Sequence, residues 1–165
     1  MKNAAAHDTS PAKRIGQLAV AIAVPLLVGV IGATVGAPGA WYAGLTKPPL
    51  NPPNWVFGPA WTTLYILMGV AVYLVWRRGL QDARVRWALT AFAVQLVFNG
   101  LWSLIFFGLE MTLLALVDII LLIIAIVITM QLFLPLSRMA TILLVPYLAW
   151  VVFATYLNAA IFLLN

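Results

Sequence analysis

Three apolar stretches of the sequence carry polar and aromatic side chains at i, i+3 or i+4, and i+7, the spacing of one helical face. The members are Trp61, Tyr65 and Met68 in one stretch, Gln95, Asn99, Trp102 and Ser103 in another, and Tyr147, Trp150 and Ala154 in the third. If these faces converge, they form an aromatic-walled pocket for a large, flat, mostly apolar ligand. The alternative is helix packing, with Asn and Gln hydrogen bonds worth roughly 0.6–2 kcal/mol each.

Asp118 is the acidic residue that lies deep inside an apolar stretch, and no Lys or Arg lies at comparable depth. A buried carboxyl without a basic partner is expected to be protonated or hydrogen-bonded to hydroxyls and backbone. Asp118 is therefore either a proton-linked or ligand-contacting group, or a hydrogen-bonded contact between helices.

The sequence contains none of the conventional sets of catalytic residues. It has no cysteine, and its one histidine, His7, lies in a polar N-terminal segment. The apolar stretches hold no paired carboxylates, no glycine-rich phosphate loop and no Ser/His/Asp set. We therefore predict no metal site and no required cofactor, and the hydrolase and phosphoryl-transfer classes fit poorly.

The composition places these stretches in a membrane. The chain has 165 residues, of which 65% are hydrophobic and 8% are charged, and its mean hydropathy is +1.08. A soluble domain of this length needs more polar residues to cover its surface. The chain is thus predicted to be an all-α integral membrane protein with a single domain.

Five apolar runs are close to the roughly 20 residues that cross a bilayer. They cover about 15–37, 57–76, 87–107, 111–134 and 139–164. The turns between the later runs are short, which makes neighbouring helices antiparallel. We predict a polar N-terminal tail over 1–14 and one five-helix transmembrane domain over 15–165. Small residues in the first run, such as Gly29 and Gly32, permit close packing within the bundle or in a dimer.

The connector between the first two runs, WYAGLTKPPLNPPNWVFGPAW (41–61), contains five prolines. Because proline fixes φ and removes a backbone donor, we expect a stiff, non-helical Pro/Trp-rich loop. Its aromatic residues, Trp41 and Trp55 among them, are either a lid over a site or an interfacial belt.

Basic residues gather on one side of the five-span topology. That side carries Lys2, Lys13, Arg14, Arg77, Arg78, Arg84, Arg86 and Arg138, and the other carries only Lys47. The positive-inside rule then places the N-terminus in the cytoplasm and the C-terminus outside. Topology accounts for the formal net charge of +5, so we expect no nucleic-acid partner.

Motifs along nearly the whole chain resemble the TspO/MBR family of tryptophan-rich sensory proteins and mitochondrial translocator proteins, which includes the peripheral-type benzodiazepine receptor. These motifs are WYAGLTKPPLNPPNWVFGPAWTTLY (41–65), FNGLW (98–102), FFG (106–108), ALVD (115–118) and PYLAWVVFATYLN (146–158). The combination of WYAGL, KPP and NPPNWVFGP is highly specific.

The resemblance implies a five-helix bundle, usually a homodimer, that binds porphyrins such as protoporphyrin IX and haem and synthetic benzodiazepine and isoquinoline carboxamide ligands. It implies ligand-site positions at Trp41, Tyr42, Pro48, Trp61, Tyr65, Asn99, Trp102, Tyr147, Trp150 and Ala154. Mitochondrial members also bind cholesterol through a C-terminal motif that needs a tyrosine and an arginine. Here Ala159 and Leu163 stand at those positions, so cholesterol recognition by that motif is not expected.

Three functions follow as hypotheses. The first is a porphyrin-binding protein that senses or handles tetrapyrroles. The second is light- and oxygen-dependent porphyrin degradation, in which the resemblance implies catalytic roles for Trp61 and Trp150. The third is a porphyrin, lipid or sterol transporter, which the absence of an internal repeat disfavours. The short C-terminal tail and basic N-terminus favour a bacterial inner membrane over a mitochondrial one.

Overall fold

The computed structural model describes residues 10–35 and 39–165, and every regular element in those ranges is a helix. Within them, five helical segments are long and apolar enough to cross a membrane, which confirms the predicted five-helix bundle. The elements are α1 (Pro11–Val35), α2 (Ala40–Gly44), α3 (Asn54–Trp76), α4 (Ala83–Ser103) with its π-helical extension η1 (Leu104–Gly108), α5 (Thr112–Phe133), α6 (Arg138–Leu143) and α7 (Val145–Leu164).

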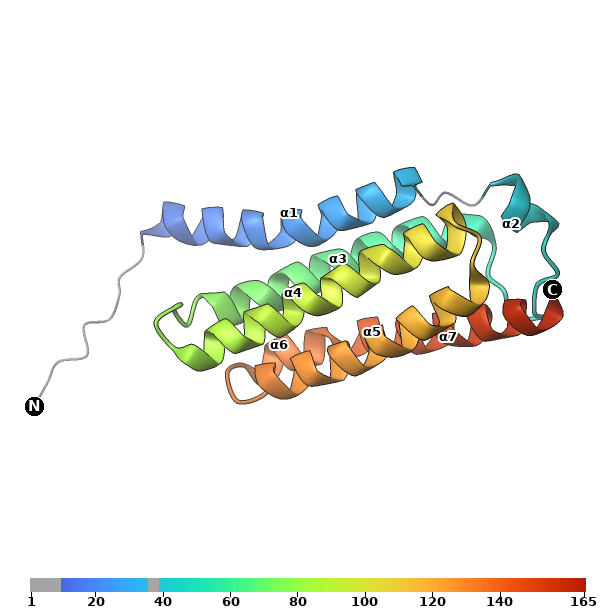
Figure 1. Cartoon of the computed structure of the whole chain (residues 1–165). Helices are drawn as coiled ribbons and strands as arrows, with labels where there is room; N and C mark the ends of the chain where they lie inside the picture. The colour runs from blue at the N-terminus through green and yellow to red at the C-terminus, as the bar shows by residue number, and fades with distance from the viewer. Residues whose placement is uncertain (1–9, 36–38) are drawn as a thin grey trace, which may run out of the picture.

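The long helices lie side by side in an elongated bundle (Figure 1). The α3–α4 and α5–α6 loops lie at one end, while α2 and the C-terminus lie at the other. Helix α1 packs against α3 and α4, and α5 packs against α4 and α7. Most of α1 stays uncovered by the bundle, because the other long helices do not surround it.

Helix α1 begins earlier than the sequence suggested. The polar tail was expected over 1–14, but Pro11 opens the helix, and residues 1–9 lie outside the described ranges. The Ser10 hydroxyl accepts a hydrogen bond from the Lys13 N–H at 3.4 Å, and the Ser10 carbonyl accepts one from the Arg14 N–H at 3.2 Å. A serine cap followed by proline is a strong helix start, and it outweighs the polarity of these residues.

The expectation of a non-helical connector over 41–61 is wrong at both ends. Residues Ala40–Gly44 form α2, and α3 begins at Asn54, so only residues 45–53 are irregular. Pro53 precedes the first turn of α3, where its missing N–H costs nothing. Pro59 lies in the second turn and removes a single backbone hydrogen bond, which the rest of the helix offsets.

The last span, expected over 139–164, is found at Arg138–Leu164, but it is divided into two helices. Helix α6 ends at Leu143 and α7 starts at Val145. Pro146 has no N–H to donate to the Ile142 carbonyl, and its ring crowds that carbonyl. The Leu144 N–H instead bonds the Thr141 carbonyl at 3.1 Å, which tightens the chain at the junction.

Gly69 sets the distance between α1 and α3. A Cβ added at this position would lie 2.5 Å from the Ile22 Cα and 2.8 Å from the Ala21 carbonyl oxygen. Both are backbone atoms of α1 and cannot move aside. The two helices therefore approach closely through a glycine, as small residues allow inside membranes.

Candidate functional site

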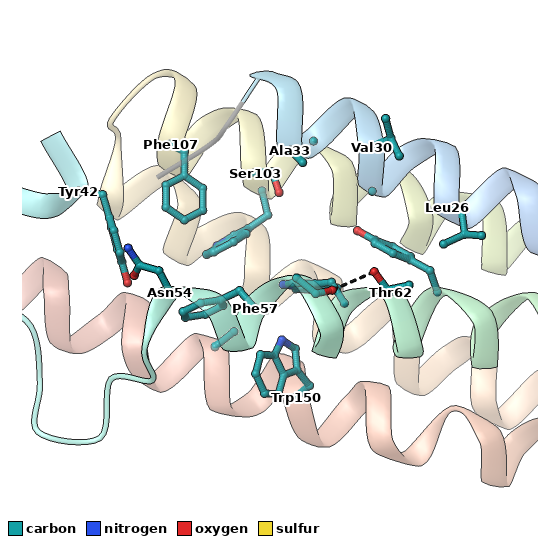
Figure 2. A pocket seen from close by; sticks show the side chains of 17 residues that line it. Leu26, Val30, Ala33, Tyr42, Asn54, Phe57, Thr62, Ser103, Phe107 and Trp150 are labelled. Carbon is teal, nitrogen blue, oxygen red and sulfur yellow. Dashed lines mark hydrogen bonds between the residues drawn. The ribbon is translucent and has the colours of Figure 1, made fainter. Parts of the chain in front are cut away.

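A cavity of about 380 Å³ lies between α1, α3, the α4–η1 junction and α7, toward the end of the bundle that carries α2. It is lined by Leu26, Gly29, Val30, Gly32, Ala33, Tyr42, Asn54, Phe57, Gly58, Trp61, Thr62, Tyr65, Trp102, Ser103, Phe107, Trp150 and Ala154. Figure 2 shows Leu26, Val30 and Ala33 of α1 on one side, Phe57 and Trp150 on the other, and Tyr42 at one end. The volume falls in the usual range for small-molecule sites.

Aromatic rings build the walls and hold one another in place. Trp61 stacks on Tyr65 with ring centroids 5.5 Å apart. Phe57 meets Trp150 edge-on at 6.1 Å. Because rings in such contacts keep fixed orientations, the cavity presents preformed flat surfaces.

Trp150, which lines the cavity, carries a hydrogen-bond donor without a partner. Its indole Nε1 is buried and has no partner among the described residues. By contrast, the Trp102 Nε1 donates to the Asn158 Oδ1 at 3.1 Å. A buried donor without an acceptor is costly, and a ligand acceptor beside Trp150 would remove that cost.

Behind the Tyr65 wall lies a buried chain of polar side chains. The Tyr65 hydroxyl donates to the Asn99 Oδ1 at 2.8 Å, and the Asn99 Nδ2 donates to the Tyr147 hydroxyl at 3.2 Å. The Tyr147 hydroxyl donates in turn to the Gln95 Oε1 at 2.7 Å. All four residues are buried, so the chain joins α3, α4 and α7 and fixes the Tyr65 ring.

Replacing Tyr147 by phenylalanine is expected to lower the free energy of unfolding by about 1–2 kcal/mol. The change leaves the Gln95 oxygen and an Asn99 N–H without the bonds they make to the Tyr147 hydroxyl. Thermal unfolding of the detergent-solubilised protein measures it. Tyr156→Phe is the matched control, because Tyr156 is exposed. An equal shift in both variants would show that the buried chain contributes nothing.

The π-helical turn η1 positions the rings at the α4 end of the cavity. The Leu109 N–H bonds the Leu104 carbonyl at 2.8 Å, which is the wide π spacing. Trp102, just before this turn, stacks on Phe106 at 5.1 Å. Asn158 holds Trp102 from α7 and also donates to the Thr112 carbonyl at 2.8 Å. Trp102 is therefore fixed by η1 and by α7, and the Asn158 side chain that holds it is itself tied to the start of α5.

Tyr42 and the irregular segment after α2 close the outer end of the cavity. The Tyr42 hydroxyl donates to the Asn51 Oδ1 at 3.0 Å, and the Lys47 ammonium lies 4.8 Å from the centre of the Tyr42 ring. Burial raises the pKa of the Tyr42 phenol, although the Asn51 hydrogen bond opposes it, so the hydroxyl stays a donor at neutral pH.

Asn165 ties the same segment to α7. Its Oδ1 accepts from the Thr46 N–H at 2.9 Å, and its Nδ2 donates to the Thr46 carbonyl at 3.1 Å. Two opposed hydrogen bonds to one residue hold the backbone in a fixed place. The segment is thus anchored beside the cavity.

Six of the ten ligand-site residues expected from the sequence line the cavity: Tyr42, Trp61, Tyr65, Trp102, Trp150 and Ala154. The other four do not line it. Asn99 and Tyr147 lie behind Tyr65 in the buried polar chain. Trp41 packs edge-on against Phe106 at 5.7 Å, and Pro48 is buried in the irregular segment. Ligand contact by any of the ten stays a prediction.

The contribution of α1 to the cavity was not predicted from the sequence. Gly29 and Gly32 lie at the cavity, and the Tyr65 ring occupies the space that a side chain at Gly29 would fill. The small-residue spacing in α1 carried that signal, but it indicated helix packing in general. Gly36, a further small residue of the first apolar run, lies outside the described ranges.

Asp118 lies on α5 outside the cavity lining. The residue is 6% exposed, and its Oδ2 has no hydrogen-bond partner in the described part of the chain. This placement does not decide whether Asp118 is a proton-linked or ligand-contacting group or a hydrogen-bonded contact between helices. Residues 10–35 and 39–165 contain no group of three His, Cys, Asp or Glu side chains that could hold a metal ion.

Comparison with known proteins agrees with the motifs. The family model described as TspO/MBR matches residues 21–164. The chain is 46% identical to the tryptophan-rich protein TspO of Archaeoglobus fulgidus over 152 residues, which cover 90% of this chain and 97% of that protein. It is 42% identical to the tryptophan-rich sensory protein of Cereibacter sphaeroides over 136 residues, which cover 81% of this chain and 84% of that protein. It is 45% identical to the human translocator protein over 120 residues, which cover 72% of this chain and 70% of that protein. The chain is therefore an integral membrane protein of the TspO/MBR family.

Proposed function

We propose that the cavity binds a porphyrin, with protoporphyrin IX or haem as the ligand, and that the protein senses or handles tetrapyrroles in the membrane. The observation that carries the proposal is the set of rings around one cavity, Trp61, Tyr65, Trp102 and Trp150. A flat macrocycle buries its faces against such rings and gains stacking as well as hydrophobic free energy.

The polar groups at the cavity suit the same ligand. The Trp150 N–H has no partner among the described residues and would donate to a ring nitrogen or a carboxylate of the porphyrin. The rim on α1 and α3 is formed by exposed residues, among them Val30, Ala33 and Thr62. In a bilayer this rim faces lipid, so an apolar ligand could enter sideways from the membrane.

Light- and oxygen-dependent degradation of the porphyrin is the second candidate. The observation that favours it is that Trp61 and Trp150 both line the cavity. An indole beside the photoexcited macrocycle can donate one electron to it, and the resulting porphyrin radical anion adds molecular oxygen. Cleavage of one ring double bond then leaves both oxygen atoms in the product as carbonyl groups, and the oxygen adduct returns one electron to the indole radical cation. Trp61→Phe is expected to stop product formation while leaving binding nearly intact. Product yield equal to wild type would remove Trp61 from the reaction.

One titration separates the two candidates. The purified chain is titrated with protoporphyrin IX in the dark, with tryptophan fluorescence as the readout, and the sample is then illuminated in air. Saturable quenching with a stable porphyrin spectrum supports binding or sensing. Saturable quenching followed by Trp61-dependent bleaching supports degradation, and quenching that does not saturate contradicts both.

We also propose an orientation with the N-terminus in the cytoplasm and the C-terminus outside, in the inner membrane of a bacterium. The support is the charge asymmetry: the α3–α4 and α5–α6 loops, together with the first residues of α4 and α6, carry five arginines at one end of the bundle, and such basic ends favour the cytoplasm. The homodimer that the motifs imply stays a prediction.

A further inference from the structure

A second hollow lies at the end of the bundle opposite α2. It measures about 440 Å³ and is lined by Arg78 of the α3–α4 loop, by residues 134–137 of the α5–α6 loop and by Arg138 at the start of α6. Figure 1 shows these two loops at the same end of the molecule. The hollow therefore lies at the opposite end of the bundle from the aromatic cavity.

The arginines at this end differ in their partners. Three are engaged: Arg77 lies 6.0 Å from the Tyr73 ring centre, Arg84 pairs with Asp82 at 2.8 Å, and Arg86 donates to the Leu80 and Gln81 carbonyls at 2.9 and 3.0 Å. The side chains of Arg78 and Arg138 have no partner among the residues that the structure describes, and both residues line the hollow. Two arginines thus border one space whose lining contains no carboxylate.

The rest of the hollow is largely apolar. Leu134 is 52% exposed, and Pro135 is exposed beside it. The Ser137 hydroxyl caps α6 by accepting from the Ala140 N–H at 3.3 Å. A ligand that fits must present negative charge to the arginines and apolar groups to Leu134 and Pro135.

We propose that this hollow binds the phosphate of an anionic phospholipid. Guanidinium groups bind phosphate oxygens in bidentate fashion, and basic hollows at the membrane surface between helices take anionic headgroups. A free phosphate ion would satisfy the arginines but would leave Leu134 and Pro135 uncovered. The glycerol and the start of the acyl chains cover them, which favours the lipid.

The test is the affinity of the detergent-solubilised full chain for phosphatidylglycerol, measured by native mass spectrometry against phosphatidylcholine with the same acyl chains. Arg78→Gln combined with Arg138→Gln is expected to weaken phosphatidylglycerol binding on the order of thirtyfold, since each arginine contributes about 1 kcal/mol. Arg77→Gln combined with Arg84→Gln removes the same charge outside the hollow. This control should change binding by about twofold or less, because long-range attraction between exposed charges is screened.

Three results would overturn the proposal: an equal loss in both double variants, equal binding of phosphatidylcholine, or displacement of the lipid by an equimolar amount of inorganic phosphate. The first indicates attraction by net charge alone, the second a site without headgroup preference, and the third a site for a soluble anion. None of these results bears on the aromatic cavity.

Discussion

Gly29→Ala is expected to lower the affinity for protoporphyrin IX by roughly tenfold or more, because overpacking of this kind costs about 1–3 kcal/mol. The added Cβ would lie 2.7 Å from Cδ2 of Tyr65 and closer still to Cε2. The ring must then leave its stack with Trp61 and pull its hydroxyl from Asn99. A single methyl group thus disturbs one whole wall of the cavity.

The measurement is a titration of the porphyrin absorption band in the dark. Gly16→Ala is the control within the same helix, since a Cβ there meets nothing within 4 Å, and it should bind as the wild type does. If Gly29→Ala binds with wild-type affinity while remaining folded, Tyr65 is not part of the ligand's wall.

Replacing both Trp61 and Trp150 by alanine is expected to weaken porphyrin binding on the order of a hundredfold, since each lost ring contributes about 1.5 kcal/mol. Both rings line the cavity, and their removal takes away two of its four stacking rings and the Trp150 donor. The corresponding phenylalanine pair keeps most of the stacking area, so its affinity should fall only modestly. The same absorbance titration compares the variants.

The control pair is Trp55→Ala with Trp87→Ala. These side chains are 76% and 69% exposed, and neither lines the cavity. The control should bind porphyrin as the wild type does. Equal affinity in the Trp61/Trp150 alanine pair and the wild type would refute the pocket.

Helical spacing predicted the aromatic face of α3 well, because Trp61 and Tyr65 are one turn apart and point to the same side. The same rule also predicted Asn99 and Tyr147 as cavity residues, but neither lines the cavity. It placed them on the correct faces, but it could not tell the layer that touches a ligand from the layer behind it. That distinction depends on how the helices pack against one another, and the spacing of residues along a single helix does not reveal this packing.

Two other features could not be predicted from composition: where the connector becomes helical, and which residue packs against Gly29. Five prolines in 41–61 suggested a wholly irregular connector, yet prolines before or within the first turns of α3 are compatible with helix. Gly29 was visible as a small residue, but its partner Tyr65 is far away in sequence. Pairings of this kind need the tertiary contact between α1 and α3 and are not specified by either segment.

The most direct test of the porphyrin site is the set of indole N–H signals in a ¹H–¹⁵N spectrum of ¹⁵N-tryptophan-labelled protein titrated with protoporphyrin IX in the dark. The chain has seven tryptophans, and single substitutions assign their signals. We predict that the Trp150 and Trp61 signals shift in a saturable manner, with Trp150 gaining an acceptor, while the Trp55 and Trp87 signals stay in place. Saturable binding that leaves the Trp150 and Trp61 signals unmoved would place the ligand elsewhere and contradict the account.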